Sequence, residues 1–263
     1  MNNFFDIKRF TRYYISDIKQ IFSNVGLSLM LLSLGGLISY LIWVGFSLCI
    51  YKEWDAPILG FNIIVFSILS IIMLISMQAK CYGHITDKRQ GSNWLMVPVS
   101  KFEKFLSMLI NIFIIIPIIF FGIYLGIDYI ISLLDTTYSA SIISTIDNSI
   151  SLFLEEIKDS DTMLLAGRLI LSGINDIILY LAIFLIGALY FKKNKVVKTI
   201  LSILALSIIL SICASPFIVN FIKEEEMNLD LIKTIITKSL VIDYVFIIGL
   251  LYWIYYRVKT ITH

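Results

Sequence analysis

Two carboxylates stand inside long apolar stretches of this sequence, Asp176 in the run LSGINDIILY and Asp243 in the run LVIDYVF. An acid near the middle of a membrane costs about 2.5–3.5 kcal/mol on insertion scales, so its presence needs a reason. Two such acids sharing one proton could activate water for peptide hydrolysis, which is the chemistry of an aspartyl protease. The flanks INDI and VIDY lack the glycine-bearing motif of such enzymes inside membranes, which speaks against this activity.

Two other interpretations of the acids remain open. Each could face the interior of a helical bundle and find an Asn, Ser or Tyr side chain, Arg168 or Lys238 as a structural partner. Alternatively, the acids could line a polar path for a substrate or its head group. Asn62 and Asn111, also in apolar runs, would then be companions on that path, although each could equally make a hydrogen bond between helices.

Other chemistry finds little support in the sequence. The phosphate-binding pattern GxxxxGK[ST] is absent, so the chain has no ATP-binding P-loop of its own. His84 and His263 are far apart, and the three cysteines lie in or beside apolar runs, so we expect no metal site, no cofactor and no disulfide framework. There is no basic stripe with interleaved aromatic residues, so we expect no nucleic-acid partner.

Composition places the chain in a lipid bilayer. Of 263 residues, 59% are hydrophobic and only 15% are charged, with a mean hydropathy of +0.90, whereas soluble domains carry about 25% charged residues. We predict an all-α integral membrane protein, residues 1–263 forming one transmembrane domain. Residues 1–25 have the aromatic and basic pattern of a helix lying in the membrane interface. The predicted spans are 27–50, 59–78, 104–127, 164–191, 199–222 and 239–256.

Charge segregates between the two sides of this predicted bundle. Fifteen of the 21 Lys and Arg residues fall in the N-terminal segment, the loops after spans two and four, and the C-terminal tail. The other side holds most of the 19 acids. Many of them lie in the external segment 128–163, where Ser149 to Lys158 could form an amphipathic helix on the outer surface. Because cytoplasmic loops are enriched in Lys and Arg, both termini are expected in the cytoplasm.

The loop between spans two and three carries the most detailed pattern. Trp94 to Val97 form an apolar cluster that Pro98 ends, since proline disfavours helix for the residue before it. Ser100 and Glu103 have the spacing of a capping box, which predicts a helix start at about Ser100. The cluster could simply be a membrane-interface anchor, or it could be a short amphipathic cytoplasmic helix that a soluble partner grips. Pro117 predicts a kink in the span that follows.

These residues resemble the corresponding loop in bacterial permease-like proteins of the type-two ABC exporter superfamily. Weaker similarities run from Gly187 through Phe191 to Thr199 and from Tyr255 to Lys259. In that superfamily a short coupling helix after the second span docks onto a separate ATPase subunit, which binds the ATP. One departure is that this chain has its large external segment between spans three and four, whereas many relatives place external helices between spans five and six. The resemblance implies coupling residues at Asp87, Lys88, Arg89, Trp94, Leu95, Met96, Pro98, Ser100, Glu103 and Lys104.

The sequence therefore leads to a specific functional expectation. The chain is expected to be the permease subunit of an ABC transporter in a bacterial cytoplasmic membrane, paired with a second copy or a sister permease. The chain itself would not be an enzyme, because ATP hydrolysis would belong to the partner. The candidate substrate path contains Asn62, Asn111, Asp176 and Asp243. The alternative is a multi-pass membrane protein that does not transport but acts as a scaffold or immunity protein.

Overall fold

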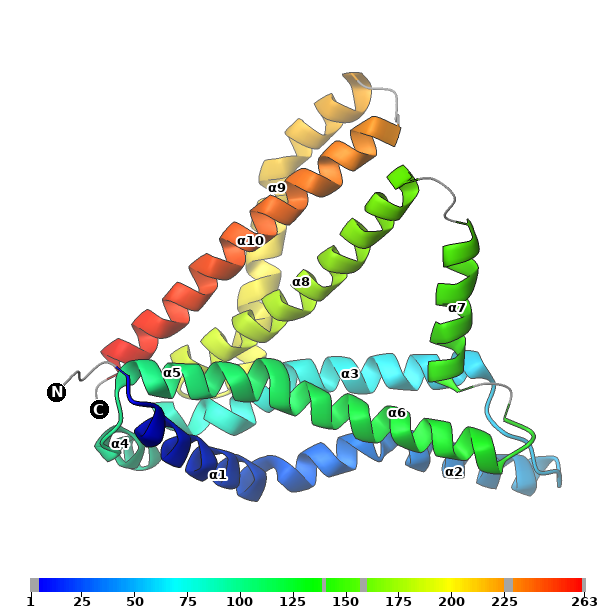
Figure 1. Ribbon diagram of the computed structural model, residues 1–263, viewed down its shortest axis with the longest axis horizontal. Coiled ribbons are helices and arrows are strands. Elements are labelled where there is room, and N and C mark those ends of the chain that lie inside the picture. Colours follow the sequence, from blue (N-terminus) through cyan, green and yellow to red (C-terminus); the bar gives the residue numbers. More distant parts are fainter. Residues whose placement is uncertain (1–4, 139–140, 157–159, 225–228, 262–263) are drawn as a thin grey trace. The chain divides into compact units, whose positions relative to one another are not determined.

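The computed structural model describes residues 5–138, 141–156, 160–224 and 229–261. Within this part it leaves out the side chains of residues 88–90, 93, 153–156, 160–162, 165, 213–224 and 229–236. All regular elements in the described ranges are helical (Figure 1), as predicted. Within the described residues, six helical segments are long and apolar enough to cross a membrane, which confirms the predicted number: Ile7–Ile50, Leu59–Thr86, Lys101–Leu134, Ala166–Tyr190, Lys195–Ile212 and Thr237–Thr260. The chain is therefore a multi-pass membrane protein.

The chain divides into two compact units. Unit 1 comprises Met1–Cys81 and Leu106–Asp159, and unit 2 comprises Tyr82–Phe105 and Ser160–His263. The elements of unit 1 are α1 (Ile7–Ser33), α2 (Gly35–Ile50), α3 (Leu59–Tyr82), the π-helical segment η2 (Asn111–Ile115), α6 (Ile116–Leu134) and α7 (Ile142–Glu156). Those of unit 2 are η1 (Gly83–Thr86), α4 (Lys88–Met96), the start of α5 (Lys101–Ile110), α8 (Ser160–Tyr190), α9 (Lys195–Glu224) and α10 (Leu229–Thr260).

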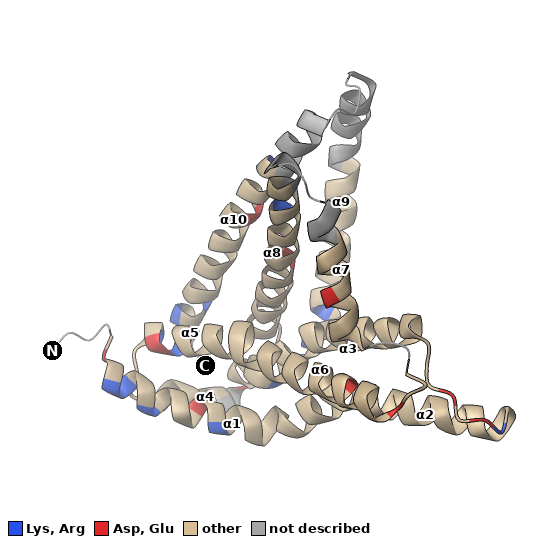
Figure 2. Ribbon diagram, turned by 45° about the vertical axis from the view of Figure 1, so that its right-hand side comes forward, with Lys and Arg blue, Asp and Glu red and all other residues tan. Residues whose placement is uncertain are grey.

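In unit 1, one helix covers the predicted interfacial segment and the start of the first predicted span. The Asp6 carboxylate caps α1 by accepting hydrogen bonds from the backbone N–H groups of Lys8 and Arg9, at 2.9 and 3.4 Å. The helix continues through Gly26 to Ser33, and α1 gives way to α2 at Leu34. Figure 2 shows basic residues along the first half of α1 and mostly acidic residues at the opposite end of unit 1, where α2 and α6 finish.

The third span changes its helical geometry just before Pro117. The structure has a five-residue π-helical segment, η2, directly ahead of α6, in which Pro117 occupies one of the first two positions. Proline has no backbone N–H to give to the preceding turn, and its ring crowds the carbonyl four residues earlier. A wider turn relieves that crowding, so the irregularity expected at Pro117 takes the form of a π-helical segment at Asn111–Ile115.

In unit 2, α8 packs along α10 and also meets α9. Gly187 makes the second contact possible, because a Cβ atom added there would overlap the Thr199 hydroxyl and lie 2.8 Å from Thr199 Cβ. The Thr199 hydroxyl donates in turn to the Lys195 carbonyl at 2.7 Å. Small residues of this kind let membrane helices approach closely.

We expect Gly187→Ala to lower the thermal unfolding midpoint of the detergent-solubilised protein. The added methyl group must push α9 away, at a cost of about 1–3 kcal/mol. Gly173→Ala is the matched control on the same helix, since a Cβ atom at Gly173 would meet no atom within 4 Å. That control should be neutral or raise stability by roughly 0.5–1 kcal/mol. Equal effects of the two substitutions would contradict the close contact.

Candidate functional site

The centre of the candidate site is α4, a nine-residue helix that follows the second span. It has one inward and one outward side. Trp94 is only 7% exposed, whereas Met96 is 77% exposed and Pro98 is also exposed. Lys88 and Arg89 were predicted as coupling residues, but their side chains lie outside the described part of the chain.

Lys104 fixes the end of α4. Its ammonium group donates to the carbonyls of Trp94 at 2.7 Å and Leu95 at 3.5 Å, and it lies 4.5 Å from the centre of the Trp94 ring. The last carbonyls of a helix have no partners within the helix, so a buried lysine on them satisfies the backbone and complements the negative end of the helix dipole. The face of the indole ring adds a cation–π attraction. The short helix α4 is thereby attached to the first turn of α5.

The predicted capping box is present at the start of α5. The Ser100 N–H donates to the Glu103 carboxylate at 3.0 Å, and the Glu103 N–H donates to the Ser100 hydroxyl at 3.2 Å. Glu103 is fully buried. The two residues thus hold the turn between Pro98 and α5 in a fixed conformation.

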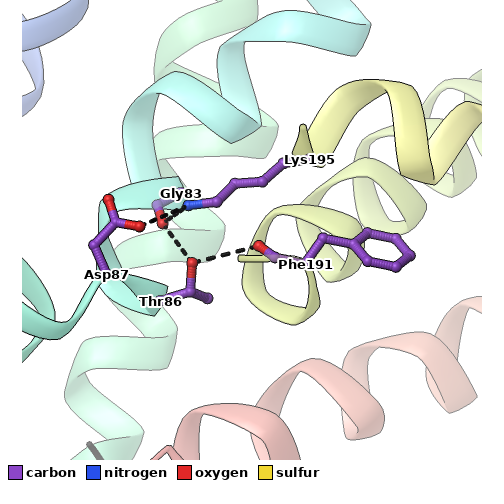
Figure 3. Close-up of polar contacts among 5 residues, drawn as sticks. All are labelled: Gly83, Thr86, Asp87, Phe191 and Lys195. Atoms are coloured by element: carbon purple, nitrogen blue, oxygen red, sulfur yellow. Dashed lines mark hydrogen bonds and ion pairs between the residues drawn. The ribbon is translucent and has the colours of Figure 1, made fainter. Parts of the chain in front are cut away.

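A second set of contacts connects η1 to the loop after α8 (Figure 3). The Thr86 hydroxyl lies 3.0 Å from the Gly83 carbonyl and 3.4 Å from that of Phe191. The Lys195 ammonium group donates to the Gly83 carbonyl and lies 3.7 Å from the carboxylate of Asp87. Because Asp87 is half-exposed, the ion pair itself adds little stability. The contacts nevertheless bring the two basic loops predicted from the sequence together.

The C-terminal end of α10 joins the same assembly. Arg257 donates from Nε to the Leu189 carbonyl at 3.2 Å, and its guanidinium carbon lies 5.5 Å from the Tyr190 ring centre. Lys101 donates to the carbonyl of Lys259. The Tyr255 ring packs against Phe105, with centroids 5.4 Å apart. We call this assembly the basic platform; it consists of residues 83–105, 187–199 and 255–259. The basic platform thus joins three segments that lie far apart in the sequence.

The candidate path residues of unit 1 lie in two separate polar clusters. Asn111 donates to Asp17 at 3.0 Å, and the same carboxylate oxygen accepts from the Ser107 hydroxyl at 2.5 Å. All three side chains are buried. They tie α1 to the point where α5 passes into η2. No sequence pattern singles out Asp17, because its spacing places it among the polar residues of an amphipathic helix.

Asn62 belongs to a second cluster, which we call the tyrosine–aspartate cluster. It contains Asn62, Tyr40, Trp54, Asp128, Asp135 and Tyr138. Asn62 donates to the Tyr138 hydroxyl at 2.8 Å, and that hydroxyl donates to Asp128 at 2.5 Å. Burial and the hydrogen bond to Asp128 raise the pKa of Tyr138, so this phenol stays protonated. Asn62 is thus a partner in an interhelical hydrogen-bond network at one end of α3.

The two acids of unit 2 have different surroundings. Asp176 on α8 is exposed, and Asp243 on α10 is half-buried. Beside Asp176, the side-chain amide Nδ2 of Asn175 is buried and has no hydrogen-bond partner within the described part of the chain. The two path residues of unit 1 therefore belong to different clusters. The described residues contain no group of three or more potential metal ligands.

Comparisons with known proteins found no relatives. No protein-family model matches the chain, no curated protein matches it, and no solved structure matches it.

We expect Lys104→Met to loosen α4 selectively. The substitution leaves two helix-end carbonyls of a buried segment without their charged donor, a loss of about 1–3 kcal/mol. Limited proteolysis by trypsin after residues 88 and 89, followed by mass spectrometry, should become faster than in the unaltered protein. Lys193→Met is the matched control, because Lys193 is exposed and makes no hydrogen bond or ion pair within the described residues. Unchanged cleavage in Lys104→Met would show that α4 does not depend on this lysine.

Asp135 should give the protein an acid-dependent loss of stability. Burial alone would raise the pKa of Asp135, but hydrogen bonds from Thr137, Tyr40 and Trp54 outweigh it and lower the pKa to about 2. An unfolded aspartate titrates near about 3.9. The stabilisation is therefore present above about pH 4 and is lost as the pH falls toward about 2. Thermal unfolding midpoints in detergent test this. The Asp135→Asn variant should be less stable than the unaltered protein at pH 6 and should lose less stability than it on acidification. Parallel pH profiles of the two proteins would contradict the role of Asp135.

Proposed function

We propose that this protein is the permease subunit of an ABC transporter, in which α4 is the helix that contacts a separate ATPase subunit. The observation that carries the proposal is the construction of α4. It is short, follows the second span, and is tied at both ends to longer helices of unit 2 by Lys104, Thr86 and Lys195. A helix that transmits movement from a soluble partner must be attached rigidly to the spans that it moves.

The outward side of α4 fits a protein partner. Met96 is almost fully exposed next to a segment rich in Lys and Arg, and methionine and arginine are enriched where proteins meet. An exposed methionine side chain is flexible enough to fill an irregular pocket on a partner. The absence of an ATP-binding P-loop in the chain is consistent with a partner that supplies ATP hydrolysis.

The orientation in the membrane follows from charge. The basic platform holds most of the Lys and Arg residues outside α1, and α1 holds four more. The positive-inside rule places both in the cytoplasm, with both termini on that side. In a bacterium this corresponds to the cytoplasmic membrane. Two permease copies, or one copy and a sister permease, would assemble on a pair of ATPases.

Coupling would run from α4 into the third span. ATP-driven closure of the ATPases would displace α4, and the capping box at Ser100 and Glu103 would pass the displacement to α5. The π-helical segment at Asn111–Ile115 is a place where the third span can bend, because its hydrogen bonds are already irregular. Asp176 on α8 and Asp243 on α10 remain the candidate polar groups for the substrate path.

We expect Met96→Glu to reduce recovery of the ATPase by at least about tenfold in pull-downs from native membranes in mild detergent, because it places a charge in the centre of the contact. Met163→Glu is the matched control, since Met163 is 62% exposed at the opposite end of α8 from the basic platform. The control should bring down the ATPase as well as the unaltered protein does.

Two outcomes would overturn the proposal. If the unaltered protein never recovers an ATPase, the chain is not a transporter subunit, and a non-transporting scaffold explains it better. If an ATPase is recovered equally with Met96→Glu, α4 is not the docking helix.

A further inference from the structure

The first residues of α7 attach this helix to the rest of unit 1. The Asp128 carboxylate, which accepts from Tyr138 through one oxygen, accepts the backbone N–H of Ile142 through the other at 2.7 Å. The Ser141 hydroxyl accepts the N–H of Ser144 at 3.1 Å, as an N-cap residue does. Two of the N–H groups that open a helix are thus held, one of them by a residue of the third span. The start of α7 is therefore fixed to the end of α6.

Aromatic residues mark the depth of this anchor in the membrane. Trp54 and Tyr51 are exposed in the loop after α2, and Tyr129 is exposed near the end of α6. Trp54 also donates from its indole N–H to Asp135, at 3.1 Å. Exposed Trp and Tyr side chains at the ends of spans are typical of the boundary between lipid and water. The tyrosine–aspartate cluster, and with it the start of α7, lies at that boundary.

From this anchor α7 runs crosswise to the spans. Both views of unit 1 show α3 and α6 lying alongside each other, with α7 leaving their common end at a steep angle to both (Figures 1 and 2). The spans cross the membrane. A helix that begins at the membrane boundary and lies at a steep angle to the spans therefore runs along the membrane surface.

The sequence of α7 gives it one apolar side. Ile142, Ile143, Ile146 and Ile150 fall within about a third of the helix circumference. Ile142 is buried near the anchor, whereas Ile143, Ile146 and Ile150 are 40%, 48% and 52% exposed. The remaining circumference is mainly polar, including Asp147, Asn148 and Ser151. Helices with this pattern bury the apolar side in the head-group region of a bilayer.

We propose that α7 is an in-plane membrane helix whose face of Ile143, Ile146 and Ile150 is covered by lipid. We call these three residues the isoleucine face. Its branched aliphatic residues suit lipid, and α7 contains none of the Met and Arg residues that are enriched in protein interfaces. Residues 129–156 contain no Lys or Arg, while α7 carries Asp147, Glu155 and Glu156. The helix is thus suited to zwitterionic lipid and is repelled by anionic lipid.

The experiment uses the full-length protein in liposomes of phosphatidylcholine. On a variant whose three cysteines are replaced by serine, Ile146→Cys and Asn148→Cys are labelled separately with an environment-sensitive fluorophore. These positions lie on opposite sides of α7. Lipids carrying a nitroxide near the head group should quench the label at 146 at least roughly twofold more than the label at 148. Aqueous iodide should show the reverse order.

A second pair, Ile150→Cys and Ser151→Cys, should give the same order and guards against a local disturbance at either position of the first pair. Replacing half of the phosphatidylcholine by phosphatidylglycerol should reduce quenching by lipid at 146 and 150, because the acids of α7 are repelled. The proposal is overturned if the two sides of α7 are quenched equally by lipid. It is also overturned if the labels at 146 and 150 are shielded from both quenchers, since a protein would then cover the isoleucine face.

Discussion

The contact of Lys104 with the last carbonyls of α4 is the interaction on which the basic platform depends. A nine-residue helix is too short to be stable by itself in water, so it must be held by its surroundings. Lys104 does this at one end through the Trp94 carbonyl and the Trp94 ring. At the other end, Thr86 and Lys195 connect η1 to the loop after α8. Basic residues therefore stabilise this region through backbone carbonyls more than through ion pairs.

In unit 1, acidic side chains hold the structure together by accepting hydrogen bonds. In a membrane protein a buried carboxylate is tolerated when nearby donors satisfy it. Asp17 has Ser107 and Asn111, Asp128 has Tyr138 and the N–H of Ile142, and Asp135 has Tyr40, Trp54 and Thr137. Asp17 and Asp135 join segments that are distant in sequence, whereas Asp128 holds the start of α7 to the end of α6. The polar groups of unit 1 thereby fix the positions of apolar helices that packing alone would orient only loosely.

The sequence predicted local features well and contacts between distant residues poorly. The six apolar segments and the capping box at Ser100 follow from composition and spacing within a few residues, so they could be read directly. For Asn62 and Asn111 the sequence left open a shared path with Asp176 and Asp243 or a hydrogen bond between helices. Their partners, Tyr138 and Asp17, are 76 and 94 residues away, and no spacing rule reveals such pairing. Asp17 escaped notice for the same reason, because its burial and its contacts with Ser107 and Asn111 cannot be inferred from the spacing of residues in α1.

The central claim is that the outward side of α4 meets a soluble ATPase subunit. The most direct test replaces Met96 by a photo-crosslinking amino acid in the full-length protein and irradiates native membranes. The account predicts a crosslinked product that contains the chain and an ATPase subunit, and no such product when the same amino acid replaces Met163. Products formed only with lipid at position 96, or an ATPase captured equally from both positions, would contradict it.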